Sequence, residues 1–156
     1  MRRDHLWLED QLKLLLSKYF SDVKITNPVE IQFGREAKYR FGSIRLLKSK
    51  SSMSLKLLMS LKSLKKQEPQ KSIITITSMF AKRAIPVKVV RYTIGHELCH
   101  YAHGFSSTNR RLFKFPHHGG IVNRELSERG AHDLITAYKK WLKTYRKKIL
   151  ENRAKV

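Results

Sequence analysis

Two histidines and one glutamate at a defined spacing give this sequence its clearest chemical signal. His96, Glu97 and His100 form the pattern His-Glu-x-x-His. Residues four apart in an α-helix lie on one face, so both imidazoles can be directed at one metal ion with the glutamate beside them. In this pattern the histidines bind zinc, and the glutamate takes a proton from a zinc-activated water and passes it to a leaving amine. The pattern therefore predicts a hydrolytic zinc site.

The motif does not fix the third ligand, and several later residues are candidates. His103 follows His96 by seven residues, which separates them by about 10 Å along a straight helix, an awkward span for one tetrahedral ion. His117 and His118 come after a loop long enough to return to the helix, beside glycines that allow close backbone packing. Glu125 would lie on the next expected helix. These alternatives stay open on the residues alone.

The helices that must position these residues are indicated by their boundaries and by apolar spacing. Pro86 and Gly104 are typical of the first turn and of the residue past the end of a helix, so the motif is expected on one helix between them. Apolar residues at helical spacing predict an N-terminal amphipathic helix over residues 3–20 and a long basic C-terminal helix over about 122–153.

Strand-like segments lie on either side of a basic insertion. Residues 39–46 alternate in polarity, and Ser72–Phe80 is rich in β-branched residues. Residues at about 48–71 are biased toward Lys, Ser and Leu, which predicts an insertion between two strands of one sheet, either a DNA-contacting arm or a linker without a role. We expect residues 1–156 to form one α+β domain. The N-terminal and motif helices would cover one face of a small antiparallel or mixed sheet, and the C-terminal helix would close the cleft.

The charge of the chain predicts a polyanionic partner. Thirty-three Lys and Arg against 12 Asp and Glu give a net charge of +21, which favours contact with nucleic acid, single-stranded or damaged DNA included. In the expected C-terminal helix, Tyr138, Trp141 and Tyr145 alternate with Lys and Arg, a combination suited to stacking on single-stranded bases. Aromatic residues at helical spacing also pack in cores, so both interpretations stay open.

The sequence gives no sign of a membrane or secreted protein. It has no uncharged apolar run of about 18 residues, so no membrane-spanning helix is expected. Acidic residues interrupt the N-terminal segment, and no signal-peptide cleavage site follows it. The single cysteine, Cys99, excludes an intrachain disulfide, fits a reducing compartment and is expected to be a buried packing residue. We expect a cytoplasmic protein, with nucleoid-associated or nuclear localisation open.

The segment PVKVVRYTIGHELCHYAHGF, followed by PHHGG, resembles the SprT-like zinc metalloproteases, the group that includes Spartan, over roughly residues 30–125. In that family a strand precedes a helix with His-Glu-x-x-His, and a later His-Gly supplies the third zinc ligand. The resemblance implies a zincin-like sheet and one zinc ion, with His96 and His100 as ligands and Glu97 as the catalytic base.

The same resemblance assigns the third ligand and a substrate. The family's His-Gly matches His118-Gly119, with Val122 in the apolar position that commonly follows, and His117 becomes a neighbouring group or a transition-state donor. The implied activity is hydrolysis of proteins bound or crosslinked to DNA. The chain departs from the family in its insertion at residues 48–71 and in having no Cys-rich zinc ribbon.

Two other hypotheses remain. The segment NRELSERG is similar to the glutamate helix of gluzincin peptidases, so the chain could be a small cytosolic peptidase with Glu125 as third ligand and with no link between its charge and nucleic acid. It could also be a non-catalytic nucleic-acid-binding protein, in which four ligands, His117 and His118 included, close a structural zinc site.

Overall fold

The computed structural model of the chain describes residues 2–48 and 70–156, which form a mixed α and β structure. Within this part of the chain, no helix has the length and apolar character needed to cross a membrane. The described elements are four α-helices, a three-stranded sheet and two short 3-10 turns. In chain order they are α1 (His5–Tyr19), β1 (Val29–Phe33), β2 (Gly42–Lys48), β3 (Gln70–Ile76), η1 (Ser78–Ala81), α3 (Val87–Ala102), η2 (His118–Gly120), α4 (Ile121–Glu128) and α5 (His132–Ala154).

The sheet is mixed and has one apolar face. The strand order is β1-β3-β2, with β1 parallel and β2 antiparallel to β3. Ile31 and Ile44 both pair with Ile74, so these three side chains share one face. Gln32 and Arg45 belong to the opposite face and are exposed. The face with Ile74 is therefore the core face, although Ile73 of β3, on the opposite face, is also buried at 7% exposed. Strand β2 forms one edge of the described sheet.

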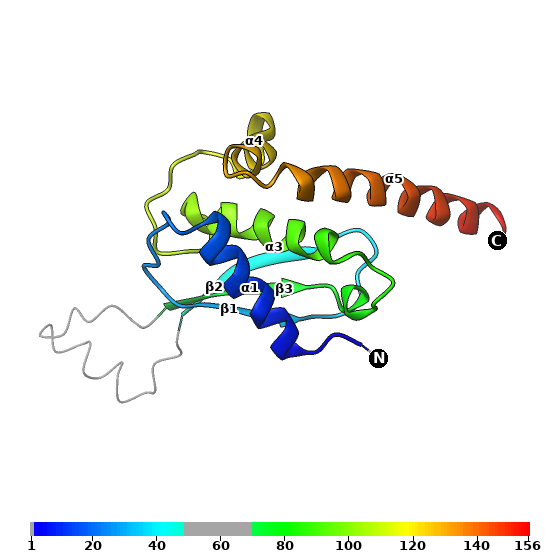
Figure 1. The fold of residues 1–156 in the computed structure, drawn as a ribbon, viewed down its shortest axis with the longest axis horizontal. Coiled ribbons are helices and arrows are strands. Elements are labelled where there is room, and N and C mark those ends of the chain that lie inside the picture. Colours follow the sequence, from blue (N-terminus) through cyan, green and yellow to red (C-terminus); the bar gives the residue numbers. More distant parts are fainter. Residues whose placement is uncertain (1, 49–69) are drawn as a thin grey trace, which may run out of the picture.

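Helix α3, which contains the His-Glu-x-x-His motif, is the central element. It lies between the sheet and the C-terminal helices α4 and α5 (Figure 1). Helix α1 contacts both β1 and α3, so the N-terminal and motif helices cover the same face of the sheet, as predicted. One apolar cluster joins all these elements, and its members include Leu12 of α1, Ile74 of β3, Ile94 and Leu98 of α3, and Leu134 of α5.

Two of the predicted helices are confirmed and the third is divided. The helix expected over residues 3–20 is α1, and the motif helix lies between Pro86 and Gly104 as α3. The single helix predicted over about 122–153 is wrong, because α4 and α5 are separated at Gly130. Gly130 has φ +83, a left-handed conformation that costs other residues roughly 1–2 kcal/mol. This residue turns the chain, so α4 and α5 can each pack on α3.

The strand predictions are confirmed in position but not in extent. Strand β3 ends at Ile76 rather than at Phe80, because the Thr77 side chain accepts a hydrogen bond from the Met79 amide and starts the turn η1. The insertion predicted at about 48–71 lies outside the described residues except at its ends, which belong to β2 and β3. Those strands pair antiparallel, so the insertion joins neighbouring strands of one sheet.

Candidate metal centre

Helix α3 presents His96 and His100 to a cleft while its opposite side fills the core. The two histidines are one turn apart, and their ring centroids are 4.8 Å apart. Val90, Ile94 and Leu98 of the same helix are fully or almost fully buried in the apolar cluster. Packing of these apolar residues therefore fixes the direction in which the two imidazoles point.

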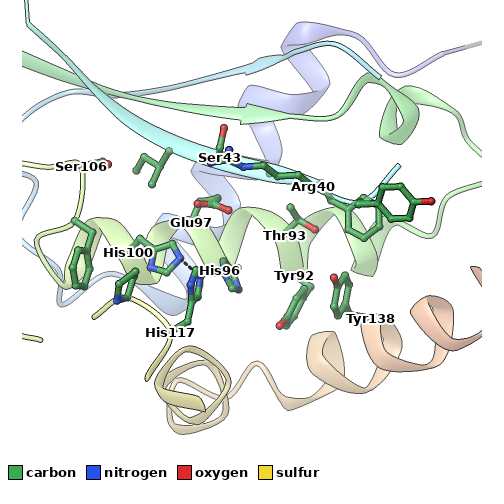
Figure 2. A pocket seen from close by; sticks show the side chains of 16 residues that line it. Arg40, Ser43, Tyr92, Thr93, His96, Glu97, His100, Ser106, His117 and Tyr138 are labelled. Carbon is green, nitrogen blue, oxygen red and sulfur yellow. Dashed lines mark hydrogen bonds between the residues drawn. The ribbon is translucent and has the colours of Figure 1, made fainter. Parts of the chain in front are cut away.

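His117 completes a cluster of three imidazoles. Its Nε2 atom lies 3.1 Å from Nε2 of His96 and 2.9 Å from Nε2 of His100 (Figure 2). Nitrogen ligands around a tetrahedral zinc-like ion lie about 3.3 Å apart, because each metal–nitrogen distance is about 2.0–2.1 Å. The three side chains form a group that could hold a metal ion. All three donor atoms lie within 4.8 Å of one another, so one divalent cation could bind to three nitrogen ligands here.

The structure places His117, and not His118, at the third position. His118 is exposed, begins the turn η2 and lies with its ring 6.3 Å from that of Phe115, outside the cluster. The chain reaches α3 at His117 and then turns away, since Gly119 and Gly120 both have positive φ. The assignment of His118 is therefore corrected to its neighbour. The side chains of adjacent residues such as His117 and His118 point in different directions. The sequence did not show which of the two would face α3.

Burial keeps the helical histidines neutral, which is the form that binds metals. Burial, and then the neighbouring His117, lower the pKa of His96 to about 4. Burial, followed by the charges of the nearby histidines, lowers the pKa of His100 to about 3. A neutral imidazole has a free nitrogen lone pair. At neutral pH both nitrogens are therefore ready to bind a cation without first losing a proton.

Glu97 lies at the base of the same cleft, only 6% exposed. Burial raises the pKa of its carboxyl group to about 7, against the opposing effect of the Arg40 charge. Strand β2 approaches this carboxyl group closely at Gly42, where a Cβ atom would lie 2.7 Å from Cγ2 of Thr93 and 3.2 Å from Oε1 of Glu97. A larger residue here would displace the carboxyl group, which is suited to exchange protons near neutral pH.

The cleft has a volume of about 480 Å³ and runs beside the edge strand β2. Residues 39–44 form one wall, and α3 provides the motif residues. The loop after α3 adds Phe105, Ser106 and His117 to the wall at the His100 end. At the other end Tyr92 stacks on Tyr138 of α5, with centroids 4.0 Å apart (Figure 2).

Asn27, which no sequence motif singled out, anchors the loop between α3 and His117. It is buried, and its backbone carbonyl accepts a hydrogen bond from the Tyr101 hydroxyl at 2.8 Å. Its side chain accepts from the Thr108 amide at 3.0 Å and donates to Ser72 Oγ at 2.9 Å. The Ser72 hydroxyl donates to the Ser106 carbonyl at 2.6 Å. The loop is thus tied to the sheet on its way to the cluster.

The other predicted ligand candidates, His103 and Glu125, bind each other instead. His103 is 1% exposed, and its Nε2 atom contacts Oε2 of Glu125. Oε1 of Glu125 accepts hydrogen bonds from Arg129 at 2.9 and 3.1 Å, and Arg129 also donates to the Tyr19 carbonyl at 2.8 Å and to Asp22. This network joins α3, α4 and the end of α1, and it directs Glu125 away from the three imidazoles.

The remaining sequence candidates pack in the core. Cys99 is buried, and burial raises the pKa of its thiol group, so it fits the packing role that was predicted. Tyr138, Trp141 and Tyr145 are half-buried and contact the ring of Phe41, with centroid distances of 5.3–6.5 Å. The structure therefore places these aromatic rings against the core, which is the second of the two interpretations offered by the sequence.

The position of His117 predicts which single substitution removes the metal. We expect His117→Ala to lose most of the metal bound by the wild type, because one of three nitrogen donors is absent. His118→Ala, with its side chain outside the cluster, should keep it. The measurement is metal content per chain by inductively coupled plasma mass spectrometry after identical purification without chelators. Metal lost in His118→Ala and kept in His117→Ala would restore the original assignment.

The His103–Glu125–Arg129 network predicts a loss of stability on neutralising its carboxylate. Burial alone would raise the pKa of Glu125, but hydrogen bonds from His103 and Arg129 outweigh it and lower the pKa. A lowered carboxyl pKa stabilises the fold above the unfolded value of about 4.3 and loses this effect as pH falls through the folded value. Glu125→Gln should therefore cost about 1–3 kcal/mol at pH 7, with a smaller difference from wild type in acid.

The matched control is Glu128→Gln, one turn along the same helix and exposed. This substitution should change the free energy of unfolding by no more than about 0.5 kcal/mol. Urea denaturation of both variants and the wild type at pH 7 and at pH 4 measures the difference. Equal effects of the two substitutions at pH 7 would show that the network contributes nothing specific.

Comparisons with protein-family models, with curated proteins and with solved structures find no match to this chain.

Proposed function

We propose that the chain is a zinc-dependent endopeptidase of the SprT-like type, which hydrolyses proteins bound or crosslinked to DNA. One observation carries the hydrolytic part. The Nε2 atoms of His96, His100 and His117 converge in a cleft that also contains a buried carboxyl group, Glu97, and that borders the edge strand β2. The proposal combines this geometry with the resemblance of the motif segment and with the charge of the chain.

Zinc is the cation that the donor set favours. Three neutral imidazoles are a common ligand set of catalytic zinc, which keeps a fourth position open, whereas structural zinc sites have four protein ligands. In the described part of the chain the cluster contains three ligands, and His118 is outside it. This count favours an open, catalytic site over the structural zinc of a non-catalytic binding protein. When bound, zinc would supply Lewis acidity toward water and toward a substrate carbonyl.

Glu97 supplies the proton transfers of the proposed reaction. Its carboxyl group lies beside the imidazole cluster, and burial raises its pKa to about 7. A group with this pKa accepts a proton from a water and releases it to a leaving amine at neutral pH. Because Glu97 is on α3 directly after a ligand, the packing that fixes the imidazoles also fixes this carboxyl group.

The edge strand favours an extended polypeptide as the substrate. Strand β2 pairs with β3 on one side, and its residues line the cleft on the other. An unpaired strand edge offers a row of amide and carbonyl groups that bind an extended peptide by backbone hydrogen bonds. Such pairing recognises the peptide backbone and does not require a free chain terminus. It therefore suits cleavage within a polypeptide.

The gluzincin alternative is less well supported. It requires Glu125 as the third ligand, but this carboxylate binds His103 and Arg129, and His117 takes the third position. The order of elements, with strand β3 leading into the motif helix α3, agrees with the arrangement expected from the SprT-like resemblance. The zincin-like description of the sheet rests on that resemblance.

The proposed link to DNA rests on charge. The net charge is +21, and α5 contributes many exposed cations. Clustered exposed cations bind phosphates and concentrate a protein on nucleic acid. Exposed cations of α5 are Lys139, Lys140, Lys143, Arg146, Lys147, Lys148 and Arg153.

The decisive test of hydrolysis is Glu97→Gln. This variant keeps the size of the side chain but cannot accept a proton, so we expect protein cleavage to fall about 10²- to 10⁴-fold with the metal content unchanged. The assay follows cleavage of an unfolded DNA-binding protein by zinc-loaded wild type and variant. His117→Ala should lose both zinc and cleavage. Unchanged cleavage by Glu97→Gln would exclude the proposed mechanism.

The DNA part is tested separately by the salt dependence of binding. We expect affinity for single-stranded DNA to fall steeply with salt, because each phosphate contact releases a counterion. A triple variant with glutamine at Lys140, Lys143 and Lys147 on α5 should lower the slope of log K against log salt by up to about 2 units. Fluorescence anisotropy over a range of salt concentrations gives this slope.

The control is a second triple variant with the same loss of charge near α1, at Lys13, Lys18 and Lys24, which are also exposed. Equal loss of slope in both variants would show that the charge acts without a localised DNA surface. A wild type that does not bind DNA would remove DNA from the proposal and leave the peptidase.

A further inference from the structure

Arg40 places a permanent cation in the cleft beside the metal centre. It comes two residues before strand β2, is exposed and lines the cleft together with His96 and Glu97. Among the described residues that line the cleft, it is the one lysine or arginine, and Glu97 is the one carboxylic acid. The chain has a net charge of +21, but the described lining of the cleft contains only one permanently charged cation, Arg40.

The guanidinium group of Arg40 is within electrostatic reach of the reacting groups. Figure 2 shows its side chain extending along β2 toward Glu97, above Thr93. Its charge acts on Glu97, although burial has the larger effect on that carboxyl group. A ligand group bound at Arg40 would therefore lie close to the position of the scissile bond.

Arg40 has no short-range partner within residues 2–48 and 70–156. It forms no hydrogen bond, ion pair or ring contact there, and it acts on Glu97 only through its charge. Arg129, by contrast, is held by Glu125 and Asp22 and stacks on the Phe20 ring. Glu97 does not form an ion pair with Arg40, so this guanidinium group is not needed to hold the carboxylate. Its donors are directed into a cleft where a substrate would bind.

We propose that Arg40 forms a carboxylate-binding subsite, which selects polypeptides with an Asp or Glu side chain next to the scissile bond. The planar guanidinium group presents paired N–H donors that match both oxygens of a carboxylate. The neighbouring walls provide aromatic side chains, Tyr39 and Tyr138, and the described residues that line them include no acid other than Glu97. This inference rests on the proposed peptidase function and names the substrate class of the same cleft.

The direction of the substrate follows from the position of Arg40 at the start of β2. In Figure 2 the Arg40 side chain extends from the Thr93 and Tyr92 end of the cleft toward Glu97, and His100 and Ser106 lie toward the other end. A peptide that pairs antiparallel with β2 would bring residues C-terminal to its scissile bond to the Arg40 end. We therefore expect the acidic side chain to follow, rather than precede, the cleaved bond.

The test uses pairs of peptides that differ only by Glu or Gln at one position on either side of the cleaved bond. Hydrogen bonds to a charged group predict that zinc-loaded wild type favours Glu by about 10- to 100-fold in kcat/KM at one position after the bond. Arg40→Gln should remove this preference, and Arg40→Glu should reverse it toward Lys. Arg40→Lys should keep part of it.

Arg45→Gln is the matched control. Arg45 is on β2, five residues after Arg40, is exposed, and belongs to the face of the sheet opposite the core, so its loss should leave the Glu-to-Gln ratio unchanged. Equal ratios in wild type and Arg40→Gln would overturn the inference, as would a preference located before the bond. Failure of the peptidase function is distinguishable, because zinc-loaded wild type would then cleave neither peptide of any pair.

A binding measurement separates selection from turnover. Zinc-loaded Glu97→Gln protein should bind the fluorescent Glu peptide about 10-fold or more tightly than the Gln peptide, and the additional Arg40→Gln substitution should remove the difference. Equal affinities of the Glu97→Gln protein for the two peptides would also overturn the inference.

Discussion

The close approach of three imidazole nitrogens is the constraint on which the rest of the structure depends. His96 and His100 come from one helix and are placed by its geometry alone, but His117 comes from a loop 17 residues later than His100. The His117 Nε2 atom lies 3.1 Å from that of His96 and 2.9 Å from that of His100, so the loop and the helix must be fixed relative to one another. Asn27 ties the start of the loop to β3, and the Leu112 amide donates to the His103 carbonyl at 3.0 Å. After His117, Arg129 binds Glu125 of α4 and donates to the Tyr19 carbonyl, which holds α4 to the end of α1. These polar contacts outside the cleft therefore help to position one side chain within it.

Local patterns in the sequence predicted the structural features that depend on residues close together in the chain. The helical spacing of the motif, the boundary at Pro86 and the amphipathic N-terminal segment all correspond to elements of the structure. The choice between His117 and His118 could not be made in this way, since it depends on where the chain turns after crossing α3. The break at Gly130 was missed because apolar residues continue at helical spacing on both sides of it. A mixed sheet was one of the two predicted alternatives, but the sequence did not show that β1 pairs parallel with β3, because contacts between distant segments leave no local pattern.

Burial has opposite effects on the two kinds of group in the cleft, and both effects favour the proposed chemistry. Removing water disfavours the charged form of each group, so it lowers the pKa of His96 and His100 and raises that of Glu97. The same packing of α3 against the sheet thus prepares neutral metal ligands and a carboxyl group that exchanges protons near pH 7. The tight contact at Gly42 contributes to this burial, because the absence of a side chain lets β2 cover the carboxyl group.

The charges of the molecule act at two different ranges. The exposed cations of α5 would attract a polyanion over the Debye length of about 8–10 Å. The cleft, in contrast, is lined mostly by neutral side chains, so the general positive field contributes little orientation there. Selection within the cleft must come from short-range contacts, for which Arg40 and the edge of β2 are the available groups. Long-range attraction would then decide where the protein binds, and the cleft would decide which bond it cleaves.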